Sequence, residues 1–195
     1  MFKRLILTGP LVFTLAFALA LVIPAHADTI TYSAILLGSN EVPPTGSPGT
    51  GVGVFTLNGN LLSIDETFSG LLAPATAAHI HCCGPVGVNE MVAVPFTPFP
   101  NATSGHFVTT VDLSLAATYT AAFITQEGGT VGLAEAGLIA ALNSGNTYAN
   151  IHDAPFPGGE IRGQITPAVP EPSSLLLFGT GLIAAIQAAR RRIHA

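Results

Sequence analysis

Positively charged residues are rare in this chain of 195 residues. Only 9% of its residues are charged, against about 25% in an average soluble protein. Six Lys and Arg stand against eleven Asp and Glu, which gives a formal net charge of -5. Between Asp28 and Pro167, Arg162 is the only basic residue, whereas ten residues are acidic. A body this acidic repels phosphate, which excludes nucleic-acid binding and enzymes that hold phosphorylated substrates with Lys or Arg.

The sequence also lacks the motifs of common enzyme classes. It contains no Gly-rich phosphate loop and no nucleophile elbow with a Ser-His-Asp order. Two carboxylate pairs, Asp65 with Glu66 and Asp153 with Glu160, leave a glycosidase-like mechanism open. However, adjacent residues of a strand point to opposite faces. We therefore predict no catalytic residue and expect a protein that is not an enzyme.

The other basic residues belong to targeting segments at the two ends. At the N-terminus, Lys3-Arg4 precede an apolar run over residues 11–23 and the small residues of Ala25-His26-Ala27. This order is typical of a secretory signal peptide, so residues 1–27 are predicted to be removed on export.

The C-terminal segment, residues 168–195, is predicted to be a sorting and anchor segment. Its residues 173–189 carry no charge, and their length is at the lower limit of roughly 17–25 residues for a transmembrane helix. The arginines that follow should stay on the cytoplasmic side and leave the body outside. A buried helix of the domain is disfavoured, because residues 175–186 have no polar face.

Pro170-Glu171-Pro172 precedes the uncharged span, and Arg190-Arg191-Arg192 follows it. With these parts in this order, the tail resembles the PEP-CTERM sorting signal of Gram-negative bacteria. The resemblance implies recognition by an exosortase-type enzyme, cleavage near the Pro-Glu-Pro motif, and delivery to the cell envelope or the exopolysaccharide matrix. Partners would then include the membrane before processing, through residues 173–189, and afterwards matrix polysaccharide or protein. The residues that carry the resemblance are Pro170, Glu171, Pro172, Arg190, Arg191 and Arg192.

The body, residues 28–167, has mostly the alternating pattern of β-strands. Asn58-Gly59-Asn60 predicts a hairpin, because Asn-Gly supplies the positive φ of a primed turn. One helix is expected between a Thr130 cap and Gly145, with an apolar stripe of Leu133, Leu138, Ile139 and Leu142. Residues 115–126 fit a helix or a strand equally well. The expected strands are residues 29–37, 51–57, 61–68, 77–81, 91–94, 106–113, 147–152 and 160–165.

These short strands, separated by Gly and Pro turns, predict the fold class. We expect a mainly β domain, an antiparallel β-sandwich or barrel with one or two short helices.

Three histidines form a candidate metal site. His79 and His81 alternate along one predicted strand, so their imidazoles point to one face about 7 Å apart. His152 ends another predicted strand and would join them if the two strands were neighbours. Neutral imidazole is a preferred ligand of Cu and Zn. The alternative is that these histidines are hydrogen-bonded groups without a metal.

The two cysteines, Cys82 and Cys83, are adjacent. They can form a disulfide, although adjacent cysteines close a strained ring, or remain thiols, or bind metal as thiolates. Strand alternation makes Cys83 the candidate fourth ligand, which favours Cu or Zn over Ca or Mg. We favour a redox or structural role of the pair.

Arg162 is expected to be structural. A local ion pair with Glu160, or a longer-range pair with Glu41, accounts for the single cation of the body better than catalysis does.

Three blocks of the body stand out: residues 38–44 (Gly-Ser-Asn-Glu-Val-Pro-Pro), residues 78–81 (Ala-His-Ile-His) and residues 148–164, which include Gly-Glu-Ile-Arg-Gly. In this order they resemble the CHRD domain, named for chordin. The resemblance implies a β-sandwich-like extracellular module with a structural or binding role. The family usually has Gly after His-x-His, where this chain has Cys82. The leading prediction is an exported CHRD module, and the alternative is a copper- or zinc-binding, redox-active extracytoplasmic protein.

Overall fold

The computed structural model describes residues 29–168 of the chain. The predicted signal peptide and all but the first residue of the predicted sorting segment, including its transmembrane stretch at residues 173–189, lie outside these residues. Within the described range, no helix is long and apolar enough to cross a membrane.

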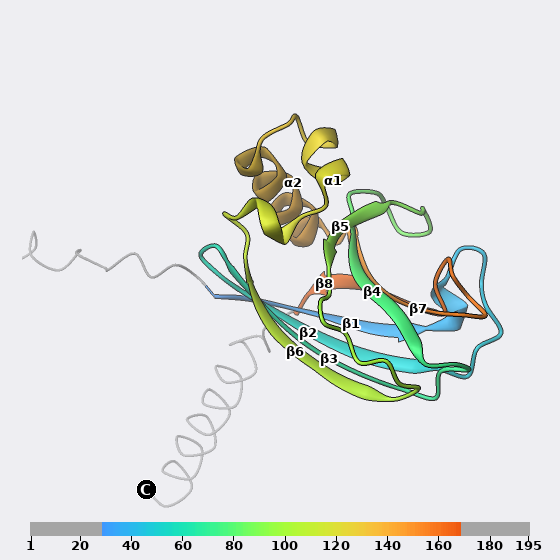
Figure 1. Cartoon of the computed structure of the whole chain (residues 1–195). Coiled ribbons are helices and arrows are strands. Elements are labelled where there is room, and N and C mark those ends of the chain that lie inside the picture. The colour runs from blue at the N-terminus through green and yellow to red at the C-terminus, as the bar shows by residue number, and fades with distance from the viewer. Residues whose placement is uncertain (1–28, 169–195) are drawn as a thin grey trace, which may run out of the picture.

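Residues 29–168 build a single eight-stranded antiparallel sheet that is strongly curled, with the helices gathered at one end (Figure 1). The strand order is β5-β4-β7-β8-β1-β2-β3-β6. The mainly β, antiparallel class predicted from the sequence is thereby confirmed, in the form of one curled sheet. The strands are β1 (Ile30–Leu37), β2 (Thr50–Asn58), β3 (Leu61–Ser69), β4 (Ala75–Cys82), β5 (Met91–Pro95), β6 (Gly105–Asp112), β7 (Thr147–Asp153) and β8 (Ile161–Pro167).

The β2–β3 hairpin follows from the sequence pattern. Gly59 has a φ of 58°, the left-handed conformation that the Asn-Gly turn requires. Along β3 every second residue is buried, which places Leu62 and Ile64 in the core and Asp65 in solvent. Glu66 is buried on the apolar face, because strict alternation leaves it no other side.

The core occupies the inner face of the curled sheet and takes side chains from all eight strands and from the helices. The two edge strands are β5 and β6. The ring of Phe96, which follows β5, stacks on Phe107 of β6 with centroids 5.2 Å apart. Phe99 contacts both rings and also stacks on Phe68. Aromatic packing therefore closes the core between the two edges of the sheet.

Two helices, α1 (Ala121–Gln126) and α2 (Val131–Ser144), complete the core. Thr130 caps α2 by accepting a hydrogen bond from the Leu133 amide, and Gly145 ends it with a φ of 71°, as predicted. The predicted apolar stripe is wrong at Leu133, which is 51% exposed. Ala134 and Ala141 are buried instead, together with Leu138 and Leu142. Residues 115–126 form the 3-10 helix η2 (Ala116–Thr118) and α1, and a further 3-10 helix, η1 (Gly38–Asn40), follows β1.

The strand β7 is buried on both of its faces, apart from the half-buried His152. Its inner face, with Ala149 and Ile151, packs into the core. Its outer face carries Tyr148 and Asn150, which are also buried. This second buried surface is polar, and it contains the candidate site.

Candidate metal centre

The pairing of β4 with β7 brings the three predicted histidines together. In this antiparallel pair His81 lies opposite Tyr148, His79 opposite Asn150, and His152 opposite Ala77. Alternation puts the three imidazoles on the same face of the sheet. One ring nitrogen from each histidine lies within 4.8 Å of those of the other two. The predicted convergence of the imidazoles is therefore present in the fold.

The spacing of these nitrogens is close to that of a metal site. His79 Nδ1 lies 3.2 Å from His152 Nε2 and is hydrogen-bonded to it. Two ligands of a tetrahedral metal with bonds of roughly 2.0–2.1 Å lie about 3.3 Å apart. The ring centroids of His79 and His81 are 5.6 Å apart, and those of His81 and His152 are 6.2 Å apart.

Backbone carbonyl groups set the tautomers of two of the imidazoles. His81 Nδ1 lies 2.7 Å from the Glu90 carbonyl oxygen, and His152 Nδ1 lies 2.9 Å from the Pro157 carbonyl oxygen. A carbonyl oxygen only accepts, so both Nδ1 atoms carry the proton and both Nε2 atoms keep a lone pair. Metal-binding histidines are oriented in this way, with the second nitrogen donating to an oxygen.

The Nε2 atom of His81 is buried and has no hydrogen-bond partner. The side chain is 8% exposed, so water does not readily reach it. A buried polar atom without a partner costs roughly 1–3 kcal/mol, and most such atoms in proteins are paired. A bound cation would supply the missing partner.

The electrostatics of the cluster keep the imidazoles neutral, the form that binds metal. Burial, with the charges of His152 and His81, lowers the pKa of His79 to about 4. Burial also lowers the pKa of His81 to about 4, against the raising effect of its bond to Glu90. The pKa of His152 is lowered for the same reason, that is, burial.

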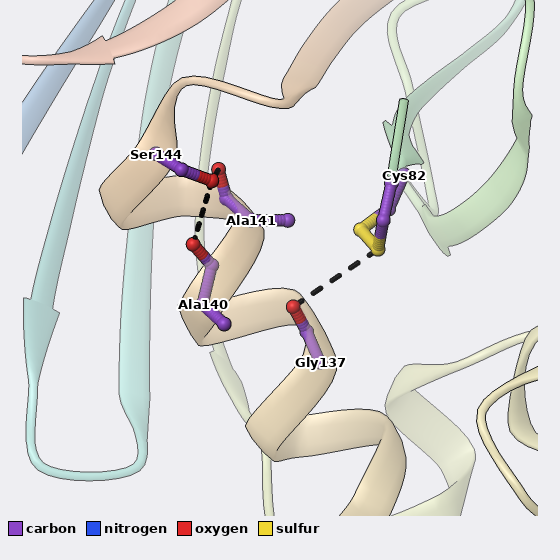
Figure 2. The surroundings of a disulfide bond; sticks show 6 residues. Cys82, Gly137, Ala140, Ala141 and Ser144 are labelled. Atoms are coloured by element: carbon purple, nitrogen blue, oxygen red, sulfur yellow. Dashed lines mark hydrogen bonds between the residues drawn. A yellow bond between two sulfur atoms is a disulfide. The ribbon is translucent and has the colours of Figure 1, made fainter. Parts of the chain in front are cut away.

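In the structure Cys82 and Cys83 are joined by a disulfide, one of the three arrangements that the sequence left open. Figure 2 shows the sulfur atoms facing α2, where Cys83 Sγ lies 4.0 Å from the Gly137 carbonyl oxygen. Both residues pack against the hydrophobic core. Cys83, the candidate fourth ligand, is not a member of the three-histidine group. Strand alternation does not extend to it, because β4 ends at Cys82.

Arg162 forms neither of the predicted ion pairs. Within residues 29–168 the one salt bridge joins His106 to Asp65 and does not involve Arg162. The guanidinium group of Arg162 instead donates to Asn89 Oδ1 (3.0 Å) and to the Val88 carbonyl oxygen (2.7 Å). It also lies over the ring of Tyr148, 3.3 Å from the centroid. The loop after β4 therefore provides the hydrogen-bond acceptors of Arg162, and these are neutral amide and carbonyl oxygens instead of carboxylates.

The two acids predicted as partners of Arg162 hold other groups. Glu41 Oε1 accepts from Asn150 Nδ2 at 2.6 Å. Burial raises the pKa of Glu41 to about 7, although the charge of Arg162 and a bond to the Val42 amide lower it. Glu160 Oε1 accepts from the hydroxyl of Ser47 and from the Leu72 amide. Both acids therefore fasten loops to the sheet.

Sequence reasoning did not find the groups that orient the histidines. Tyr148 stacks on His81 with centroids 4.6 Å apart and planes inclined by 4°. Its position on the same strand face as His152 was the available signal, because the two residues are four apart. The carbonyl groups of Glu90 and Pro157 leave no such signal, since every residue has one.

The fold and the site define a small antiparallel β domain with a polar, histidine-bearing outer face. The CHRD domain model matches residues 32–165, so the chain belongs to the CHRD domain family. The PEP-CTERM protein-sorting motif matches residues 168–192 and indicates an exported, envelope-associated protein that an exosortase-type enzyme processes. No curated protein and no solved structure matches the chain.

Proposed function

We propose that this protein is an exported, envelope-displayed CHRD module that binds one copper or zinc ion through His79, His81 and His152. The observation that carries the proposal is the buried, unpartnered Nε2 of His81, a residue that has a ring nitrogen within 4.8 Å of ring nitrogens of His79 and His152. The orientation of His81 and His152 by carbonyl groups supports the same role.

The ligand set favours copper or zinc over calcium or magnesium. Three imidazoles offer nitrogen donors, whereas Ca²⁺ and Mg²⁺ take oxygen. Within the described residues, no Cys, Asp or Glu joins the three histidines to complete a fourth position. A site with three protein ligands leaves that position to water or to a ligand from outside. The proposed role is therefore reversible metal binding at the cell surface.

The sorting motif supports the place where this binding occurs. The mature protein would begin at Asp28 after removal of the signal peptide, comprise a domain of residues 28–167, and lose residues 173–189 when an exosortase-type enzyme acts near Pro170. It would then reside in the envelope or matrix of a Gram-negative cell, with matrix polysaccharide or protein as neighbours. A negatively charged body with one cation keeps such a module soluble and away from anionic polymers.

Metal analysis tests the proposal. The full chain, expressed without a polyhistidine tag, is loaded with Cu(II) or Zn(II), freed of excess metal and measured by atomic emission. We expect about one equivalent in the wild type and a loss of at least tenfold in affinity in His81→Ala. His106→Ala is the matched control, because His106 is exposed and pairs with Asp65 elsewhere on the sheet. Wild-type protein without metal, or equal binding by His81→Ala, overturns the proposal.

A further inference from the structure

We propose that Arg162 and Tyr148 are positioning residues of this metal site, which act on His81 without contacting the ion. The inference rests on the proposed metal binding and concerns how its most buried ligand is held. It begins from Arg162, which is 2% exposed and has no carboxylate in ion-pair contact within residues 29–168. A buried charge is costly unless other groups compensate for it. Its contacts therefore indicate its role.

The first contact of Arg162 is with the segment of residues 88–90, which we call the strap. The guanidinium group donates to the Val88 carbonyl and to Asn89 Oδ1. Asn89 Nδ2 in turn donates to the Val42 carbonyl at 2.7 Å. The next residue of the strap is Glu90, whose carbonyl oxygen accepts from His81. Arg162 thus fixes the segment that determines the tautomer of His81.

The second contact of Arg162 is with Tyr148. The hydroxyl oxygen of Tyr148 accepts from the Glu90 amide at 3.1 Å, and the hydroxyl lies 3.4 Å from the Glu90 carbonyl oxygen. Tyr148 and His81 therefore both form hydrogen bonds with the backbone of Glu90 in the strap. The Tyr148 ring also lies between the guanidinium group and the His81 imidazole, parallel to the latter within 4°.

These contacts restrain the two rotations that matter for a ligand. The stack on Tyr148 sets the plane of the His81 ring, and the bond from Nδ1 to Glu90 sets which edge of the ring faces the cluster. Together they restrain the orientation of the His81 ring beside His79 and His152. Outer partners of this kind are worth about 10–100-fold in metal affinity where they have been removed.

The stack also places a fixed positive charge behind His81. A cation disfavours Cu(II) more than Cu(I), because the repulsion grows with the charge of the ion. At a separation of about 10 Å, with an effective dielectric constant of about 20, one unit of charge changes an equilibrium by on the order of tenfold. Glu41 and Glu90 lie nearby and offset part of this effect. Arg162 is therefore expected to shift the site toward Cu(I).

The test compares Cu(I) and Cu(II) dissociation constants by chelator competition in the wild type, Arg162→Met, Arg162→Lys and Tyr148→Phe, with His106→Ala as the control. Arg162→Met should change the ratio of the two constants in favour of Cu(II) by on the order of tenfold. Arg162→Lys keeps the charge and should restore the ratio. Tyr148→Phe keeps the stack but loses the hydroxyl, so it should weaken both constants about tenfold or more and leave their ratio unchanged.

A measurement on the metal-free protein protects the test against variants that fold poorly. The ¹⁵N spectrum of His81 should show a single tautomer with a proton on Nδ1 in the wild type and a mixture in Tyr148→Phe. Wild-type protein that binds neither copper nor zinc overturns the proposed function and this inference with it, whereas a wild type that binds zinc but no copper overturns this inference alone. A wild type that binds copper, with unchanged constants, ratio and tautomer in Arg162→Met and Tyr148→Phe, overturns this inference alone.

Discussion

Glu66 lies directly opposite Gly53 in the β2–β3 pair, and its carboxyl group is completely buried. Gly53 leaves room for the neighbouring Phe55 ring, because a Cβ atom there would lie 2.7 Å from that ring, whereas Glu66 Oε2 would be 3.4 Å away, in ordinary contact. Neither carboxyl oxygen of Glu66 has a hydrogen-bond partner. Burial raises the pKa of Glu66 from 4.5 to about 8, so the group is protonated at neutral pH.

This raised pKa predicts that the domain loses stability as the pH increases. Above pH 4.5 the unfolded chain ionises Glu66, whereas the folded chain keeps the proton until about pH 8. The free energy of unfolding should therefore decrease through that window. Glu66→Gln removes the titration. Its free energy of unfolding, relative to that of the wild type, should therefore be higher at pH 8 than at pH 5 by at least about 1 kcal/mol, since one pKa unit equals about 1.4 kcal/mol. Urea unfolding at both pH values measures this.

Asp65→Asn is the control for Glu66→Gln, because Asp65 is the exposed neighbour on the opposite face of β3. It should change the free energy of unfolding little at either pH. If Glu66→Gln and the wild type lose the same stability between pH 5 and pH 8, the buried carboxyl does not titrate as we expect.

Gly53→Ala should destabilise the fold by about 1–3 kcal/mol. The added methyl group would meet the rigid Phe55 ring at 2.7 Å, inside the packed core. Gly46→Ala is the matched control, because a Cβ atom at Gly46 would meet nothing within 4 Å. Thermal or urea denaturation of both variants checks the prediction, and equal midpoints would contradict it.

Much of the fold could be predicted because it is determined locally. The Asn-Gly turn, the alternation along β3, and the Thr130 and Gly145 ends of α2 each depend on a few consecutive residues. The error at Leu133 has a different origin. Which side of a helix faces the core depends on the sheet behind it, and here alanines lie against the sheet while Leu133 points to solvent.

Metal binding should raise the thermal stability of the protein. A ligand that binds only the folded state at 100 times its Kd adds about 2.7 kcal/mol to the free energy of unfolding. We expect Zn(II) to raise the Tm of the wild type and of His106→Ala, and to leave the Tm of His79→Ala and His152→Ala unchanged. Scanning fluorimetry with and without metal measures the shift. A shift of the same size in all four proteins would point to nonspecific binding.

Cys83→Ser is expected to bind metal with the stoichiometry and affinity of the wild type. Cys83 is joined to Cys82 and packs against the core beside α2, outside the histidine group. Chelator competition on the variant and the wild type tests this directly. A loss of tenfold or more in Cys83→Ser would restore Cys83 as the fourth ligand suggested by strand alternation.

The candidate site was only partly predictable for a related reason. His79 and His81 share a face through local alternation, but His152 joins them because β4 pairs with β7, and two strands intervene between these in the sequence. Periodicity does not reveal such non-local pairing. Charge counting suggested a carboxylate partner for Arg162, whereas the fold supplies carbonyl, amide and aromatic groups.

The pairing of β4 with β7 also determines when a metal can be acquired. His79 and His152 are 73 positions apart in the chain and meet only after these strands have paired. An extended polypeptide would offer separate imidazoles, each too weak a ligand to retain an ion. Loading must therefore follow folding, in whichever compartment the domain first becomes compact. For an exported protein, the metal supply outside the cytoplasm would then decide which ion the site receives.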